Sequence, residues 1–167
     1  MHNGLRLLIL ACSQRKRPAL SLLPALERYD GPWFRVLRKF LHESPSEASR
    51  LQVYILSAEF GLIPANQLIP DYDRRISRQQ ACKLNPVVLD QLQRLLESRQ
   101  YTEILISVGK DYLQALSGYE HLLPPKVKVV VSAGGLGRKQ TALHDWLRNR
   151  YDAEAVCIKP TIIHHGL

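Results

Sequence analysis

Five short apolar runs along the chain alternate with longer segments in which apolar residues recur every three or four positions. The runs occupy residues 5–11, 53–57, 104–108, 127–132 and 155–158, and they are rich in valine, isoleucine and leucine. Because the apolar residues follow one another without polar alternation, each run predicts a strand that is buried on both faces, as in a parallel sheet.

The segments between these runs show the spacing of helices that bury one face. The clearest stripe consists of Trp33, Val36, Leu37, Phe40 and Leu41. A short helix is predicted over residues 110–116, and a longer helix carries Leu143, Trp146 and Leu147.

A further helix is predicted to begin after Ile76. Ser77 and Gln80 fit a capping box, in which the serine and the residue three positions later satisfy free N–H groups. Asn85 and Pro86 fit an N-cap and a first helical position, so we expect a kink or a second helix start there.

This alternation of strand and helix predicts right-handed crossovers and an α/β fold. We expect a three-layer, open, mostly parallel sheet of about five strands with helices on both faces. The 167 residues contain no repeat and no long linker, so residues 1–167 should form a single domain. In such sheets ligands bind at the carboxyl ends of the strands. The residues that follow each predicted strand are therefore the candidates for function.

A glycine-rich loop follows the fourth predicted strand. Gly134, Gly135 and Gly137 allow the backbone to turn sharply and to approach a ligand. A helix begins behind them, so its free N–H groups, together with Arg138 and Lys139, would hold a phosphate or carboxylate. The loop matches neither Walker A nor GxGxxG. The alternative is a tight turn with exposed cations.

The loop after the first predicted strand allows two interpretations. Cys12 could act as a nucleophile whose thiolate is favoured by nearby cations, or it could be a small packing residue. Ser13 and Lys16 are the stronger candidates for ligand contacts, because a lysine near a phosphate acts as a point charge.

The region after the second predicted strand contributes acidic and aromatic candidates. Glu59 could serve as a general acid or base, or it could be an exposed turn residue. Tyr72 could stack on a base, and Asp73 could accept a hydrogen bond from a base edge or a ribose. Alternatively, Asp73 forms local ion pairs with Arg74 and Arg75.

Charge points to an anionic partner. The chain carries 23 lysines and arginines against 15 acidic residues, a net charge of +8, and residues 1–50 hold nine of the cations and four of the anions. Nucleic acid is the commonest anionic partner, with DNA favoured here over RNA. The alternative is that the excess charge serves only solubility.

Other classes of protein find little support in the sequence. Cys12, Cys82 and Cys157 form no CxxC pair, which argues against a disulfide framework. His164 and His165 with Cys157 match no tetrahedral spacing, so we predict no metal and no cofactor. Neither a bilayer-spanning run nor a secretory signal is evident. We expect a cytoplasmic protein without a membrane partner, and the sequence does not indicate its oligomeric state.

Three stretches, ACSQRK, ILSAEFGLIPANQLIPDYD and ISVGKDYLQAL, resemble the YaaA-like proteins and their short bacterial and phage relatives of unknown function. The pattern associated with that group falls on Cys12, Ser13, Lys16, Leu56, Ser57, Ala58, Phe60, Gly61, Leu62, Pro70, Tyr72, Asp73, Gly109 and Tyr112. The resemblance covers roughly residues 5–116, with a looser match through residues 134–137. It implies a YaaA-like α/β domain and a shared pocket. YaaA proper is a longer peroxide-stress protein that limits oxidative DNA damage and binds DNA.

The leading hypothesis is a protein of DNA or nucleotide maintenance, or of the stress response, that binds a nucleotide or nucleic-acid component at the carboxyl edge of the sheet. Phosphate would be held by Ser13, Lys16, Gly134, Gly135, Gly137 and Arg138. A base or sugar would be surrounded by Ser57, Tyr72, Asp73 and Tyr112, and the predicted ligand-binding set also includes Gly61 and Gly109.

An enzyme with such a pocket would suit cleavage or transfer at an N-glycosidic bond. Asp73 or Glu59 would then stabilise the developing cationic sugar or activate water. Two other hypotheses stay open. One is a non-enzymatic DNA-binding module that uses the basic surface of residues 1–50, and the other is a redox sensor built on Cys12.

Overall fold

The computed structural model, which describes residues 4–151 and 161–164, contains a six-stranded sheet in the order β4-β3-β1-β6-β7-β8. The four inner strands run parallel and are β3 (Leu51–Ser57), β1 (Leu5–Ala11), β6 (Tyr101–Ser107) and β7 (Lys128–Val131). The edge strands β4 (Gly61–Pro64) and β8 (Thr161–His164) are antiparallel to their neighbours.

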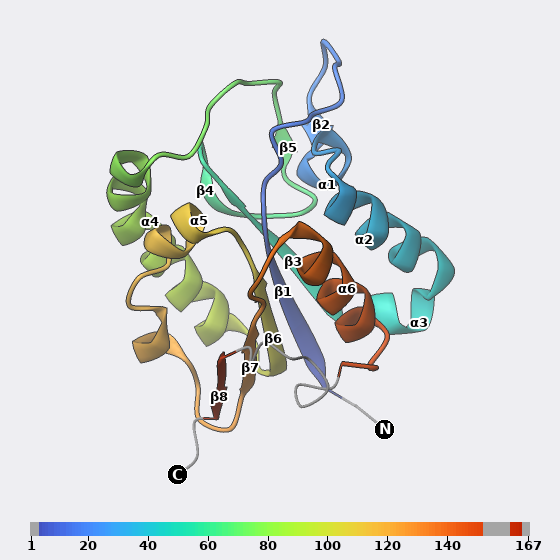
Figure 1. Ribbon diagram of the computed structural model, residues 1–167, viewed down its shortest axis with the longest axis vertical. Helices are drawn as coiled ribbons and strands as arrows, with labels where there is room; N and C mark the ends of the chain where they lie inside the picture. Colours follow the sequence, from blue (N-terminus) through green and yellow to red (C-terminus); the bar gives the residue numbers. More distant parts are fainter. Residues whose placement is uncertain (1–3, 152–160, 165–167) are drawn as a thin grey trace.

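Helices cover both faces of the sheet, which confirms the predicted three-layer α/β fold (Figure 1). The helices α4 (Arg78–Ser98) and α5 (Lys110–Ala115) pack on one face, and α2 (Pro32–Glu43) and α6 (Leu136–Leu147) pack on the other. Alternate leucines of β1 contribute to the two cores, Leu7 to the first and Leu8 to the second. A strand buried on both faces therefore consists of an unbroken apolar run.

Four of the five predicted strands correspond to the inner strands of the sheet. The run at 5–11 matches β1 at both ends, and the other three differ by one to three residues at their ends. The fifth, at 155–158, lies outside the described residues. The edge strand β4 was not predicted. It begins at Gly61, whose φ of 73° is left-handed and where a Cβ would lie 2.7 Å from Gln91 Oε1.

The helix predicted after Ile76 begins where expected, but it does not restart at Pro86. Ser77 Oγ accepts a hydrogen bond from the Gln80 backbone N–H at 3.1 Å, as an N-cap does. The Gln80 side chain donates to the Ala58 carbonyl oxygen rather than returning to Ser77. Pro86 lies inside α4, and the Asn85 side chain donates to carbonyl oxygens at the end of α5 instead of capping a new helix.

A second, two-stranded sheet follows the loop that leaves β1. β2 (Leu23–Pro24) pairs antiparallel with β5 (Leu68–Ile69), and α1 (Ala25–Arg28) follows β2 directly. The remaining short helices are α3 (Pro45–Ala48) and η1 (Tyr119–Leu122). None of the described helices is both long and apolar enough to cross a membrane.

Asp30, between α1 and α2, gathers four arginines. Its carboxylate forms ion pairs with Arg15, Arg17, Arg35 and Arg38, of which the contact with Arg38 is the shortest at 2.6 Å. Hydrogen bonds from Arg35 and Arg38 lower the pKa of Asp30 to about 2, against the opposing effect of burial. Much of the cationic excess of residues 1–50 therefore surrounds one carboxylate that joins the loop after β1 to α2.

Replacing Asp30 by asparagine should remove a pH-dependent part of the stability. Because folding lowers the pKa of Asp30 from 3.8 to about 2, its contribution is present above the ordinary value and is lost as the pH falls through the lower one. Thermal unfolding measured at decreasing pH across this window should therefore show a steeper loss for the wild type than for Asp30→Asn. Asp90→Asn, which alters an exposed carboxylate of α4, should follow the wild type, and parallel curves for all three proteins would contradict the assignment.

Candidate functional site

A cavity of about 260 Å³ lies where the loop after β1 meets the segment between β5 and α4, next to α5. Its lining residues are Cys12, Ser13, Gln14, Lys16, Asp73, Arg74, Arg75, Ile76 and Tyr112. Five of them, Cys12, Ser13, Lys16, Asp73 and Tyr112, belong to the site expected from the sequence. The fold thus brings together residues from three distant parts of the chain.

A buried cluster of hydroxyl groups lies next to Lys16 and includes the predicted site residues Ser57 and Tyr72. Ser57 Oγ accepts hydrogen bonds from the backbone N–H groups of Glu59 and Phe60 at 3.1 and 3.2 Å. It also hydrogen-bonds the hydroxyls of Tyr29 and Tyr72, at 3.3 and 3.0 Å, and these two hydroxyls contact each other. Burial raises the pKa of Tyr29 to about 12 and raises that of Tyr72 as well, so both phenols stay neutral.

Lys16 connects this hydroxyl cluster to the cavity. Its Nζ lies 4.5 Å from the ring centre of Tyr72 and 6.0 Å from that of Tyr29, within the range of cation–π attraction. Its backbone pairs with that of Tyr29 in an isolated β-bridge, and its Nζ donates to the Gln14 carbonyl oxygen at 3.3 Å. The ammonium is therefore held in place without an ion pair to any described carboxylate.

Cys12 contributes a partly buried thiol to the cavity wall. Its Sγ lies 2.9 Å from the hydroxyl of Tyr112, on α5. Burial, and then the nearby Cys12, raises the pKa of Tyr112, so that phenol is neutral and can donate to the sulfur. The thiol also packs against the core on the α2 and α6 side. Of the other cysteines, Cys82 is exposed on α4 and Cys157 lies outside the described residues.

The hydroxyl of Ser13 is engaged in the loop that carries it. Ser13 Oγ donates to the Arg15 carbonyl oxygen at 2.6 Å and accepts from the Gly31 N–H at 3.2 Å. Gly31 is needed for this contact, since a Cβ there would lie 2.8 Å from the Ser13 Cβ. Ser13 therefore shapes the cavity wall, and an incoming anion would have to compete for its hydroxyl.

The two candidate carboxylates have different surroundings. Glu59 forms an ion pair with Arg74, which lines the cavity. Asp73 lines the cavity itself and forms no ion pair with any residue in the described part of the chain. The sequence allowed a local ion pair between Asp73 and Arg74. In the structure Arg74 instead pairs with Glu59, in the turn between β3 and β4. Asp73 is the carboxylate that a ligand in the cavity would meet.

The glycine-rich loop at 134–137 is not part of the lining of this cavity. Gly134 has a left-handed φ of 96°, which favours glycine, and Gly135 is the N-cap of α6. Gly137 lies in the first turn of α6 and Arg138 is exposed. Next to them, Lys139 donates to the Val108 carbonyl oxygen at 3.0 Å. Burial, and then repulsion from Lys110, lowers the pKa of Lys139.

Two further glycines predicted for the site lie in turns at strand ends. Gly109 is the N-cap of α5 and so sets the direction of the helix that carries Tyr112. Gly61 begins β4 and faces Gln91 of α4. Neither glycine lines the 260 Å³ cavity.

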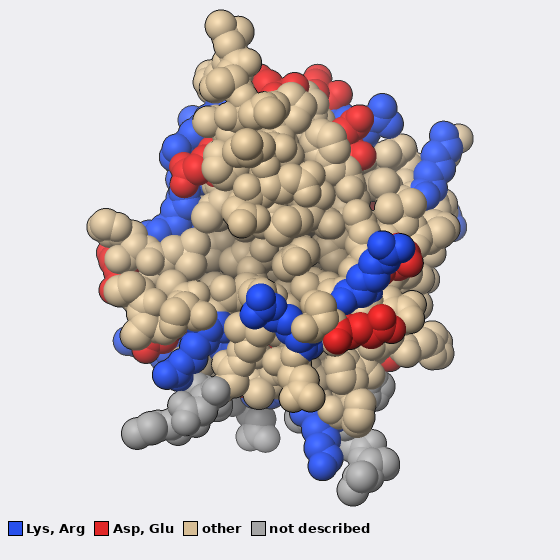
Figure 2. Space-filling view, turned by 180° about the vertical axis from the view of Figure 1, so that it is seen from behind, with Lys and Arg blue, Asp and Glu red and all other residues tan. Residues whose placement is uncertain are grey.

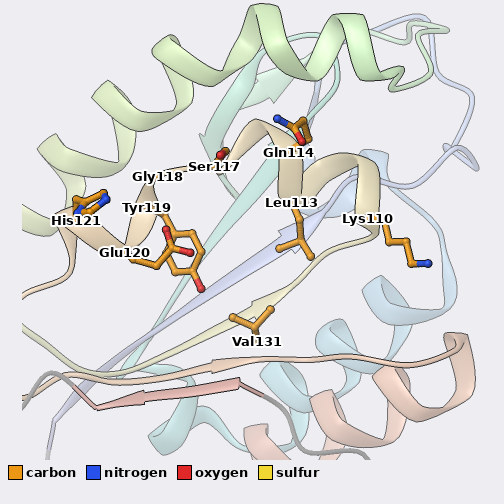
Figure 3. Close-up of a pocket in the computed structure, with 9 residues that line it drawn as sticks. All are labelled: Lys110, Leu113, Gln114, Ser117, Gly118, Tyr119, Glu120, His121 and Val131. Carbon is orange, nitrogen blue, oxygen red and sulfur yellow. The ribbon is translucent and has the colours of Figure 1, made fainter.

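A second and larger hollow, of about 660 Å³, lies between α5, η1 and the end of β7. Figure 3 shows Leu113, Tyr119 and Val131 facing its middle, with Lys110 near one end and His121 near the other. None of the residues predicted for the site lines it. Within the described residues, no group of three or more histidine, cysteine, aspartate or glutamate side chains is arranged to hold a metal ion.

Several residues of the site were not predicted from the sequence. Tyr29 is central to the hydroxyl cluster, but it stands in an irregular connection with no motif around it. Gln14 and Ile76 line the cavity, yet neither residue type signals a ligand site. Arg74 and Arg75 were noted only as partners for Asp73. The sequence contained a signal for both arginines, since two adjacent cations directly follow Asp73, a predicted site residue.

Comparison with known proteins supports the fold and assigns no activity. The crystal structure of AF0587, a protein of unknown function, is similar with a TM-score of 0.51 and 16% sequence identity, over 86% of this chain and 44% of that one. The chain thus spans less than half of that protein. No curated protein matches the chain. A family model, described as a family of unknown function, matches residues 7–145. Neither this family nor AF0587 is described as YaaA-like, so that relationship stays a prediction. Because the match covers most of the chain, the chain belongs to this family, DUF6884.

Proposed function

We propose that the 260 Å³ cavity binds a nucleotide, and that it does so through the phosphate group. The observation that carries the proposal is the charge of the lining, in which three cations, Lys16, Arg74 and Arg75, face a single carboxylate, Asp73. Clefts lined by one sign of charge concentrate ligands of the opposite sign. A phosphate is the anion that lysine and arginine together recognise best.

Two of these cations keep their charge available. Lys16 is held over the Tyr72 ring, and Arg75 forms no ion pair with a described residue. Arg74 is partly neutralised by Glu59. A lysine acts on phosphate as a point charge, whereas an arginine can donate two parallel hydrogen bonds. Lys16 and Arg75 are therefore the expected phosphate ligands.

The size of the cavity limits the ligand. Sites for drug-sized molecules measure about 300–1,000 Å³. A cavity of about 260 Å³ is large enough for the phosphate and sugar of one nucleotide and too small for a dinucleotide cofactor. This agrees with the absence of a dinucleotide-binding fingerprint in the sequence.

Hydrolysis of an N-glycosidic bond is the reaction we propose for this cavity. Asp73 would accept a proton from water while the water oxygen attacks the sugar C1′, and the carbon–nitrogen bond would break as the positive charge developing on the sugar is stabilised. The base would leave with the proton that Asp73 took up. Glu59 is less suited, because its carboxylate is held by Arg74.

The alternative of a basic DNA-binding surface formed by residues 1–50 has less support. Four of its cations surround Asp30, and Arg28 is fully buried. On the face seen in Figure 2, lysines and arginines lie scattered among acidic residues rather than gathered into one patch. The cavity therefore offers the more concentrated positive charge.

Replacing Lys16 by methionine should weaken nucleotide binding. The variant keeps an apolar stem against the tyrosine rings and removes the charge, so nucleoside monophosphates should bind about tenfold more weakly, as expected for the loss of one charged hydrogen bond. Isothermal titration calorimetry at low salt would measure this. Lys39→Met, which removes an exposed lysine of α2, is the matched control and should bind like the wild type. Equal affinity for the two variants would contradict the proposal.

Replacing Asp73 by asparagine should abolish base release. Chromatographic detection of free base after incubation with nucleotides should show release by the wild type and a rate at least about 100-fold lower for Asp73→Asn, since general acid–base groups contribute at least that much. Glu59→Gln should retain the activity. Bound but uncleaved nucleotides in the wild type would refute the enzymatic part of the proposal and leave the binding site intact.

A further inference from the structure

Three leucines near the cavity stand out into solvent. Leu20 is fully exposed, and Leu22 and Leu68 are 55% and 57% exposed. Figure 1 shows the loop before β2 extending beyond the rest of that end of the molecule, and Figure 2 shows the same end from behind as a projection without charged residues. We call Leu20, Leu22 and Leu68 the leucine tip. Large apolar side chains grouped in this way indicate a contact surface.

Arg28 holds the loop that carries Leu20 and Leu22. Its side chain is fully buried, and its guanidinium donates to the carbonyl oxygens of Arg17 and Ser21 at 2.8 and 2.7 Å, with weaker contacts to Ala19 and Ile69 at 3.4 Å. No described carboxylate neutralises this buried cation, whose removal from water is unfavourable. Its hydrogen bonds to the loop offset the free-energy cost of burying this charge. Leu20 and Leu22 therefore lie in a loop that is held by hydrogen bonds rather than in a loose turn.

The leucine tip lies on the continuations of two of the three chain segments that line the cavity. Leu20 follows Lys16 by four residues, so their Cα atoms are at most about 14 Å apart at the reach of an extended chain. Leu68 precedes Asp73 by five residues and pairs with Pro24 across the small sheet. A nucleic-acid strand rises about 3.4 Å per nucleotide. Leu20 therefore lies within about four nucleotides of the cavity.

We propose that the cavity takes one nucleotide of a nucleic-acid strand and that the leucine tip packs against the neighbouring bases. This inference rests on the proposed nucleotide binding. A free nucleotide in the cavity would leave the leucines in water, whereas a strand continuing out of the cavity would cover them. Leucine is among the side chains that wedge between bases in nucleic-acid complexes.

A protein partner explains the leucine tip less well. A stable interface between proteins buries about 800 Å² on each side and engages some 20–30 residues. The tip offers only three exposed leucines, and the loop before β2, which carries Leu20 and Leu22, forms a narrow projection (Figure 2). An inserted wedge needs little area, because its contribution comes from apolar contact with unstacked bases.

The test compares a strand with a mononucleotide. Fluorescence anisotropy would follow a labelled single strand of about ten nucleotides, as DNA and as RNA, and calorimetry would follow nucleoside monophosphates. The double variant Leu20→Ser/Leu22→Ser should bind the strand about tenfold more weakly, as loss of a wedge contact predicts, and bind the mononucleotides unchanged. Val87→Ser, which removes a comparably exposed apolar residue of α4, should leave both affinities unchanged.

Each other result would overturn the inference in a recognisable way. Equal strand affinity for the wild type and the double variant, with mononucleotide binding intact, would remove the role of the leucine tip and keep the proposed function. A change of oligomeric state in the double variant, without loss of strand affinity, would assign the tip to a protein partner. Failure of both ligands to bind the wild type would overturn the proposed function itself.

Discussion

The carboxyl edge of the sheet depends on satisfying one buried hydroxyl group, that of Ser57. A buried polar group without hydrogen bonds costs about 1–3 kcal/mol, and Ser57 ends an inner strand with no exposure to solvent. Its oxygen closes the turn into β4 through two backbone N–H groups and contacts the hydroxyls of Tyr29 and Tyr72. Those tyrosines come from the connection between α1 and α2 and from the segment before α4. A single side chain thus joins three segments that are far apart in the sequence.

The charge of the candidate site depends on which charged side chains form ion pairs in the fold and which do not. Asp30 gathers four arginines outside the cavity, and Glu59 pairs with Arg74 at its wall. Lys16 instead lies over the ring of Tyr72, which orients the ammonium without neutralising it. Because the hydroxyl cluster positions Tyr72, it also positions Lys16. The packing of the core and the charge of the cavity therefore rest on the same contacts.

Most of the fold could be predicted because its inner strands and long helices carry strong periodic signals. The apolar run of β1 matches its strand at both ends, and Ser77 caps α4 as expected. The short elements could not be predicted in this way. β2 and β5 have two residues each, which is too few to show a period, and β4 is formed by a hairpin that begins at Gly61. Pro86 signals a break, yet packing keeps α4 continuous through it.

The sequence by itself determined that polar and cationic residues follow the parallel strands, and this was enough to select Cys12, Ser13, Lys16 and Tyr112. Only the tertiary structure decided which strand ends share a cavity. It placed the loop at 134–137 outside the cavity, put Tyr29 at the centre of the hydroxyl cluster, and paired Glu59 with Arg74. The reason is that the periodicity of a strand and the residues of a turn are local features of the sequence. A cavity wall is formed by side chains from distant segments, and their separation in the sequence does not indicate that they are in contact.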